Sequence, residues 1–84
     1  MISVDKLGTR IALLRRARGL TQNQIADRLG VTPQAVSKWE RGLACPDLVC
    51  LDELSDLLGI SIDALLRGAD CEIIRTDRLE SVAI

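Results

Sequence analysis

The 84-residue sequence contains no histidine, tyrosine or phenylalanine, and Trp39 is its only aromatic residue. Histidine is the side chain that most often transfers protons in catalysis, and it is also the commonest metal ligand. Its absence, together with the lack of a nucleophile motif or a phosphate-binding loop, predicts that the chain is not an enzyme. The core is expected to consist mainly of Leu, Ile, Val and Ala, which pack well between helices.

Cysteine is also scarce. Cys45, Cys50 and Cys71 form an odd set without the Cys-x-x-Cys spacing of many zinc sites. We therefore predict buried, reduced thiols, with neither a bound metal ion nor a cofactor. The sequence also lacks a basic-then-apolar signal pattern and any apolar run of membrane length. These absences predict a cytoplasmic protein that does not associate with membranes.

Basic and acidic residues are unequally distributed along the chain, although the net charge is only −1. Residues 1–42 carry eight basic and three acidic side chains, a balance of +5. Residues 43–84 carry three basic and nine acidic side chains, a balance of −6. The basic half indicates a surface for a polyanion, and the acidic half indicates a surface kept away from it or a site for a protein partner. Chance scatter in a small protein is the alternative interpretation.

Helical spacing of apolar residues, interrupted by glycines, predicts an all-α domain of five short helices. Thr21 and Gln24 have the spacing of a capping box, which marks the start of a helix. Thr32 followed by Pro33 is a second start signal, because proline lacks the N–H that the first helical position leaves unpaired. Asp47 is expected to cap the fourth helix. The predicted helices span about residues 4–18, 21–30, 32–41, 47–58 and 61–68.

Each predicted helix has an apolar face, which is Ile25, Ala26 and Leu29 in the second and Val36 and Trp39 in the third. The first has Val4, Leu7, Ile11 and Leu14. The fourth has Leu48, Leu51, Leu54, Leu57 and Leu58. The fifth has Ile62, Leu65 and Leu66. Residues 69–84 contain apolar side chains but fit neither a regular helix nor a regular strand.

The segment TQNQIADRLGVTPQAVSKWERG, Thr21–Gly42, has the pattern of a helix-turn-helix. Ala26 is small where the next helix is expected to cross closely, and Gly30 permits the turn. Val36 and Trp39 are expected to face the core, which makes Trp39 a packing residue rather than a platform for base stacking. The outer face is then left to Gln34, Ser37, Lys38 and Arg41. Such a face suits the DNA major groove, where Gln pairs with adenine and Lys donates to guanine.

Over its five predicted helices, the sequence resembles the phage repressor and Cro-like helix-turn-helix family, also called the xenobiotic-response-element (XRE) family. The motifs are LTQNQIADRLGV, TPQAVSKWERG and PDLVCLDELSDLLGISIDALL, and the similarity covers about residues 4–68. It implies a five-helix, lambda-repressor-like DNA-binding domain over residues 1–68, with the helix-turn-helix at 21–42. Residues 69–84 would form a short C-terminal tail, either a dimerisation segment or the start of a longer region.

The resemblance also implies roles for individual residues. Gln22 would hold a DNA phosphate, and Arg41 would contact another. Arg15 and Glu40 would form an ion pair that holds the recognition helix at its docking angle. Base-edge contacts would come from Thr32, Pro33, Gln34, Ser37 and Lys38. Pro33 departs from phage members with a polar residue there, so it offers only apolar contact. The alternatives are a first-turn helix residue for Gln22 and solvated surface for Gln34 and Lys38.

Taken together, these features predict a sequence-specific transcriptional regulator, and in particular a repressor. It would read the major groove of double-stranded DNA with the helix at about 33–41. Because one such domain makes few base contacts, we expect a homodimer on a palindromic operator. The predicted dimer contact is formed by the fifth helix (Ile62, Leu65, Leu66) together with the tail. The alternative is an interaction module, such as an antitoxin or an adaptor, whose protein partner binds the acidic half.

Overall fold

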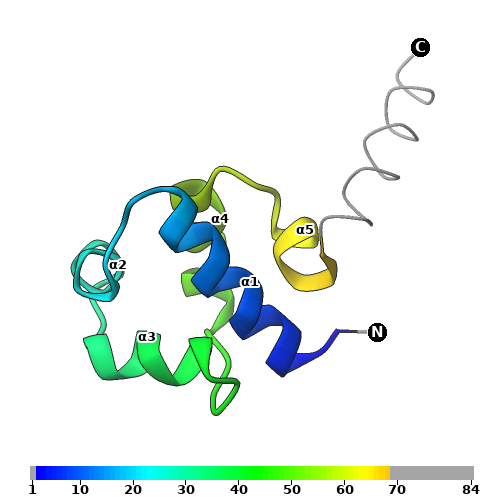
Figure 1. Cartoon of the computed structure of the whole chain (residues 1–84), viewed down its shortest axis with the longest axis horizontal. Helices are drawn as coiled ribbons and strands as arrows, with labels where there is room; N and C mark the ends of the chain where they lie inside the picture. The colour runs from blue at the N-terminus through cyan, green and yellow to red at the C-terminus, as the bar shows by residue number, and fades with distance from the viewer. Residues whose placement is uncertain (1, 69–84) are drawn as a thin grey trace.

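A computed structural model describes residues 2–68 of the chain, which form an all-α domain (Figure 1). The tail predicted over residues 69–84 and Cys71 lie outside the described residues. No helix among the described residues is long and apolar enough to span a membrane. The helices are α1 (Val4–Ala17), α2 (Gln22–Leu29), α3 (Pro33–Glu40), α4 (Leu48–Leu58) and α5 (Ile62–Arg67).

Side-chain caps begin the helices at the predicted positions. The hydroxyl of Thr21 accepts a hydrogen bond from the Gln24 N–H at 3.0 Å, and the Gln24 carbonyl oxygen Oε1 accepts from the Thr21 N–H at 2.8 Å. This reciprocal pair is a complete capping box at the start of α2. Gly30 ends the helix with φ of 70°, a left-handed conformation that glycine adopts without steric cost. The sequence pattern therefore fixes both ends of α2 locally.

The core lies where α1 crosses α3 and α5 and where α2 and α5 meet α4. Figure 1 shows α1 running through the middle of the molecule with α3 along one edge and α5 near its N-terminal half. The largest side chains with less than 2% exposure are Leu7, Ile11, Ile25, Val36, Leu54, Leu58 and Leu65. As predicted, this core is aliphatic, with Trp39 as its one aromatic member.

Several predicted positions are wrong in detail. Val4 and Leu48 were expected in apolar faces, but their side chains are 41% and 74% exposed. Both lie in the first turn of a helix, whereas the core contacts of α4 begin at Cys50 and Leu51. Leu65 was expected on a dimer surface but is fully buried, because α5 uses it to pack inside its own domain.

The cysteine prediction is half right. Cys50 is buried and Cys45 is exposed, and both are free thiols. Burial raises the pKa of the Cys50 thiol, so the protonated, unreactive form is favoured at neutral pH. The N–H of Cys50 donates to the Asp47 carboxylate at 2.8 Å, which caps α4 and holds the pKa of that carboxyl below its ordinary value. No group of three or more His, Cys, Asp or Glu side chains able to hold a metal ion occurs within residues 2–68.

Arg10 of α1 and Arg18, the residue that follows α1, act as caps for the C-terminal ends of other helices. Arg10 donates through Nε to the Leu65 carbonyl at 2.7 Å and through Nη2 to that of Leu66. Arg18 Nε donates to the Leu58 carbonyl at 2.9 Å. These carbonyls lie at helix C-termini, where the backbone lacks intrahelical donors. Part of the positive charge of the first half is therefore bound within the fold rather than offered to a ligand.

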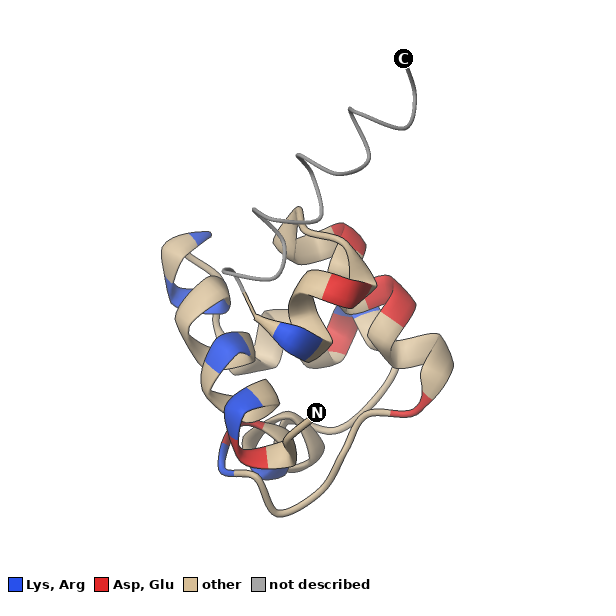
Figure 2. Ribbon diagram, turned by 90° about the vertical axis from the view of Figure 1, so that its right-hand side faces the viewer, with Lys and Arg blue, Asp and Glu red and all other residues tan. Residues whose placement is uncertain are grey.

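The two signs of charge still occupy different parts of the surface. Figure 2 shows Lys and Arg residues along α1 on one side of the view and Asp and Glu residues on α4 and α5 on the other. The acidic residues of these two helices are Asp52, Glu53, Asp56 and Asp63. The separation of charge predicted from the sequence is thus present among the described residues. Fewer cations of the first half are free for a ligand than the balance of +5 implied, because Arg10 and Arg18 are bound within the fold.

Candidate nucleic-acid interface

Helix α3 has one buried face and one exposed polar face. Val36 and Trp39 are buried against the other helices, at 0% and 6% exposure. Because these two residues point inward, the residues on the opposite side of α3 are exposed to solvent. Its exposed residues are Thr32, Pro33, Gln34, Lys38 and Arg41, and Ser37 is partly buried beside them. Six of the seven side chains predicted to contact DNA therefore occur on α3 or at its two caps, and the seventh, Gln22, begins α2.

The start of α3 is fixed by two features that the sequence predicted. Thr32 accepts a hydrogen bond from the Ala35 N–H through its hydroxyl at 3.1 Å. Pro33 occupies the first helical position, where its missing N–H costs nothing. Thr32 and Pro33 are thereby held at the exposed N-terminal end of the helix. Because the cap occupies its hydroxyl as an acceptor, Thr32 has a structural role in addition to the predicted contact with bases.

The C-terminal end of α3 lies directly against the backbone of α1. Gly8 is buried, and a Cβ atom at this position would overlap the carbonyl oxygen of Trp39 and lie 2.9 Å from that of Glu40. Only a residue without a side chain permits this approach. Sequence reasoning missed Gly8, since a lone glycine within an apolar stripe gave no indication of which neighbour would approach it.

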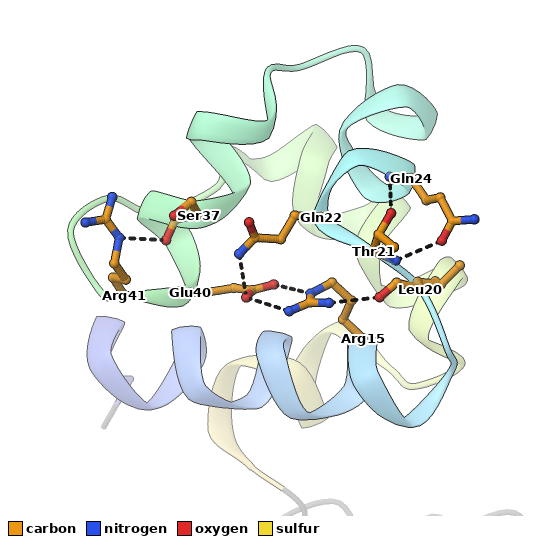
Figure 3. Close-up of polar contacts among 8 residues, drawn as sticks. All are labelled: Arg15, Leu20, Thr21, Gln22, Gln24, Ser37, Glu40 and Arg41. Atoms are coloured by element: carbon orange, nitrogen blue, oxygen red, sulfur yellow. Dashed lines mark hydrogen bonds and ion pairs between the residues drawn. The ribbon is translucent and has the colours of Figure 1, made fainter.

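An ion pair joins α1 to the last residue of α3 (Figure 3). Arg15 donates to Glu40 through Nε at 2.6 Å and through Nη2 at 3.1 Å, a two-point contact. Its Nη1 donates to the Leu20 carbonyl at 2.8 Å, just before α2. The Arg15 and Glu40 side chains are 11% and 6% exposed, so the pair is largely shielded from water. The pair implied by the family resemblance is present.

Gln22 is part of the same network. Its Nε2 donates to Glu40 Oε1 at 3.0 Å, which connects the first residue of α2 to the last residue of α3. The capping box occupies the N–H groups of Thr21 and Gln24, but those of Gln22 and Asn23 have no acceptor within the described residues. A shallow depression at this point is lined by Arg15, Thr21, Gln22 and Asn23.

Such a depression suits an anion. Free backbone N–H groups and the positive end of the helix dipole coincide at the first turn of α2. The Gln22 amide keeps a second N–H for a ligand after it has donated to Glu40. Asn23 was not singled out from the sequence, although its place in the first turn of a capped helix was a usable signal. The depression adjoins the C-terminal end of α3, as Figure 3 shows for Gln22 and Glu40.

Arg41 lies at the other end of the exposed face. It follows the last helical residue, and its Nε donates to the Ser37 carbonyl at 3.4 Å. This bond uses one of five guanidinium donors, so most of them remain available to a ligand. The exposed cation therefore extends the polar face of α3 beyond the end of the helix.

A family model for helix-turn-helix proteins matches residues 11–65. The chain belongs to this family. The matched region begins within α1 and ends within α5, so it contains every residue of the interface described above except Gly8. The all-α, repressor-like fold predicted from the sequence is confirmed.

Known members show how far the similarity extends. The prophage-derived, uncharacterised HTH-type transcriptional regulator YonR of Bacillus subtilis is 43% identical over 65 residues, covering 77% of this chain and 60% of YonR. The phage CTXphi transcriptional repressor RstR of Vibrio cholerae is 38% identical over 60 residues, covering 71% of this chain and 54% of RstR. The chain thus spans less than two thirds of the length of these relatives.

Among solved structures, the P22 c2 repressor in complex with a synthetic operator superposes with a TM-score of 0.71. It is 35% identical, and the match covers 75% of this chain and 96% of that one. The described helices therefore correspond to nearly the entire length of that repressor chain.

Proposed function

We propose that this protein is a sequence-specific DNA-binding transcriptional regulator that reads the major groove with α3. The observation that carries the proposal is the exposed polar face of α3 next to an anion-suited first turn of α2. In this assignment Gln34, Ser37 and Lys38 face base edges with Thr32 and Pro33, while Gln22 and Arg41 contact phosphates. Base contacts then provide the choice of sequence and phosphate contacts provide most of the affinity.

Repression is the proposed outcome. RstR and the P22 protein are both named as repressors. Occupying a promoter is enough to block polymerase, whereas activation needs a further contact surface. The test of the whole proposal is selection of bound sites from random double-stranded DNA at a defined salt concentration. A recurring palindrome is the expected result, and equal retention of all sequences would contradict it.

Replacing Gln34 with alanine is expected to weaken binding to the selected site by about 1–3 kcal/mol, because a bidentate amide contact to a base edge is lost. Binding to random DNA should stay nearly unchanged, since phosphate contacts are not touched. Titration of both DNAs at one salt concentration measures the difference. An equal loss on both would remove Gln34 from base recognition.

Replacing Arg41 with alanine is expected to have the opposite profile. The exposed cation follows α3, so its loss should weaken binding to specific and random DNA alike. The slope of log K against log salt should become shallower by about one unit, because one fewer counterion is released. Binding titrations at several salt concentrations measure this slope. Loss confined to the selected site would instead assign Arg41 to a base.

We further propose that the protein binds as a homodimer through a surface next to α3. Among the described residues, the most exposed large apolar side chains are Leu43, Leu48 and Val49, all within the nine residues that follow α3. Burial of Leu65 removes the centre of the surface predicted on α5. A patch of three side chains is small for a stable interface, so the dimer is expected to assemble mainly on DNA.

Replacing Leu48 with serine should therefore weaken binding to a full palindrome by about tenfold and leave binding to a half-site unchanged. The thermal unfolding midpoint should not fall, because Leu48 is 74% exposed. Leu13→Ser is the matched control, since Leu13 is also exposed but lies on α1. Equal behaviour of the two variants on the palindrome would place the dimer contact elsewhere.

A further inference from the structure

The carboxylate of Glu40 is shared between two elements. It accepts two hydrogen bonds from Arg15 of α1 and one from Gln22 of α2, while its own backbone ends α3. The side chain is 6% exposed, so these partners largely replace water around it. A single buried group thus connects the anion-suited turn of α2 to the end of the recognition helix.

This carboxylate also determines which way the Gln22 amide points. An ionised carboxylate can only accept hydrogen bonds, so the amide nitrogen must face it. The reverse orientation would place the amide oxygen against a negatively charged group in a poorly hydrated site, which is costly. With one N–H held by Glu40 at 3.0 Å, the nitrogen keeps its second N–H next to the depression lined by Asn23 and Arg15.

We propose that Glu40 is a positioning residue that couples the phosphate contact of Gln22 to the placement of α3. The proposal rests on the proposed function, since it assigns the amide to a DNA phosphate. Glu40 itself does not touch DNA. It fixes the amide that does, and through Arg15 it holds the end of α3 against α1. The phosphate contact and the reading of bases are therefore made by one connected unit.

The proposal and a purely electrostatic effect predict opposite changes in DNA affinity when the Glu40 charge is removed. Removing a negative charge near a polyanion should tighten binding to any DNA, because a repulsive term is lost. Removing a positioning group should weaken binding, because the Gln22 amide loses its orientation. In Glu40→Gln a single amide oxygen replaces two carboxylate oxygens, so Arg15 and Gln22 compete for it. The direction of the change thus separates the two effects.

A double-mutant cycle on random double-stranded DNA tests the coupling. Gln22→Ala should weaken binding of the otherwise unchanged protein about fivefold, but less than about twofold when Glu40→Gln is already present. Glu40→Gln alone should also weaken binding. Glu53→Gln is the matched control, because Glu53 is on α4 away from this network. It should leave the effect of Gln22→Ala unchanged.

Additive effects, or tighter binding by Glu40→Gln with an undiminished effect of Gln22→Ala, would overturn the coupling alone. If the unchanged protein retained no DNA, the proposed function would fail first and the coupling with it. If Glu40→Gln does not fold, the proposal can still be tested on the protein without mutations. In the free protein, hydrogen exchange by NMR should be slower for a side-chain amide proton of Gln22 than for those of exposed Gln34. Equal exchange rates would overturn the proposal.

Discussion

Replacing Gly8 with alanine is expected to lower the free energy of unfolding by about 3 kcal/mol. In most helices the same change stabilises by up to about 1 kcal/mol, because alanine has the higher helix propensity. Here the added Cβ would overlap the carbonyl oxygen of Trp39 and lie 2.9 Å from that of Glu40. Backbone atoms cannot rotate away as a side chain can, so α1 and α3 would have to separate.

The sign of the change in melting temperature shows whether the backbone clash or the helix propensity of alanine dominates at position 8. A loss of about 3 kcal/mol in a domain of this size corresponds to a fall of more than about 10 °C in the thermal unfolding midpoint. Lys6→Ala is the control, because Lys6 is exposed in the same helix and its change should stay within about 0.5 kcal/mol. A raised midpoint for Gly8→Ala would show that propensity dominates and that the two helices are not in close contact there.

The features predicted from sequence were those encoded by neighbouring residues. The capping box of Thr21 and Gln24 and the pair Thr32 and Pro33 specify helix starts within four residues, so the ends of α2 and α3 were identified correctly. The separation of Val36 and Trp39 from the exposed face of α3 follows from helical phase alone. The candidate site was predictable to this extent because most of it lies on one helix.

Apart from the Arg15–Glu40 pair, which the family resemblance implied, features that depend on contacts between helices could not be predicted from the sequence. Leu48 and Leu65 belong to equally convincing apolar stripes, yet one is exposed and the other is buried, since only packing decides which turns are covered. Arg10 and Arg18 counted toward a basic ligand surface, but the fold uses them to cap α5 and α4. The hydrogen bond from Gln22 to Glu40 joins residues 18 apart, and no local pattern predicts it.

Replacing Arg15 with alanine is expected to cost about 3 kcal/mol of stability, since breaking a buried ion pair leaves an uncompensated charge. Glu40, at 6% exposure, would lose both guanidinium donors and keep only the hydrogen bond from Gln22. The Leu20 carbonyl would lose its donor as well. The 11% exposure of Arg15 places the cost near the lower end of the range for such pairs.

Arg16→Ala is the matched control, because it removes the same charge from the next, exposed position of α1. If charge alone mattered, both variants would unfold at the same denaturant concentration and would weaken DNA binding equally. We expect Arg15→Ala to unfold at lower denaturant and to lose more affinity for the selected site than for random DNA. The reason is that α3 loses its anchor to α1, while Arg41, the proposed phosphate contact, remains. Identical behaviour of the two variants in both assays would show that the ion pair neither stabilises the fold nor orients the recognition helix.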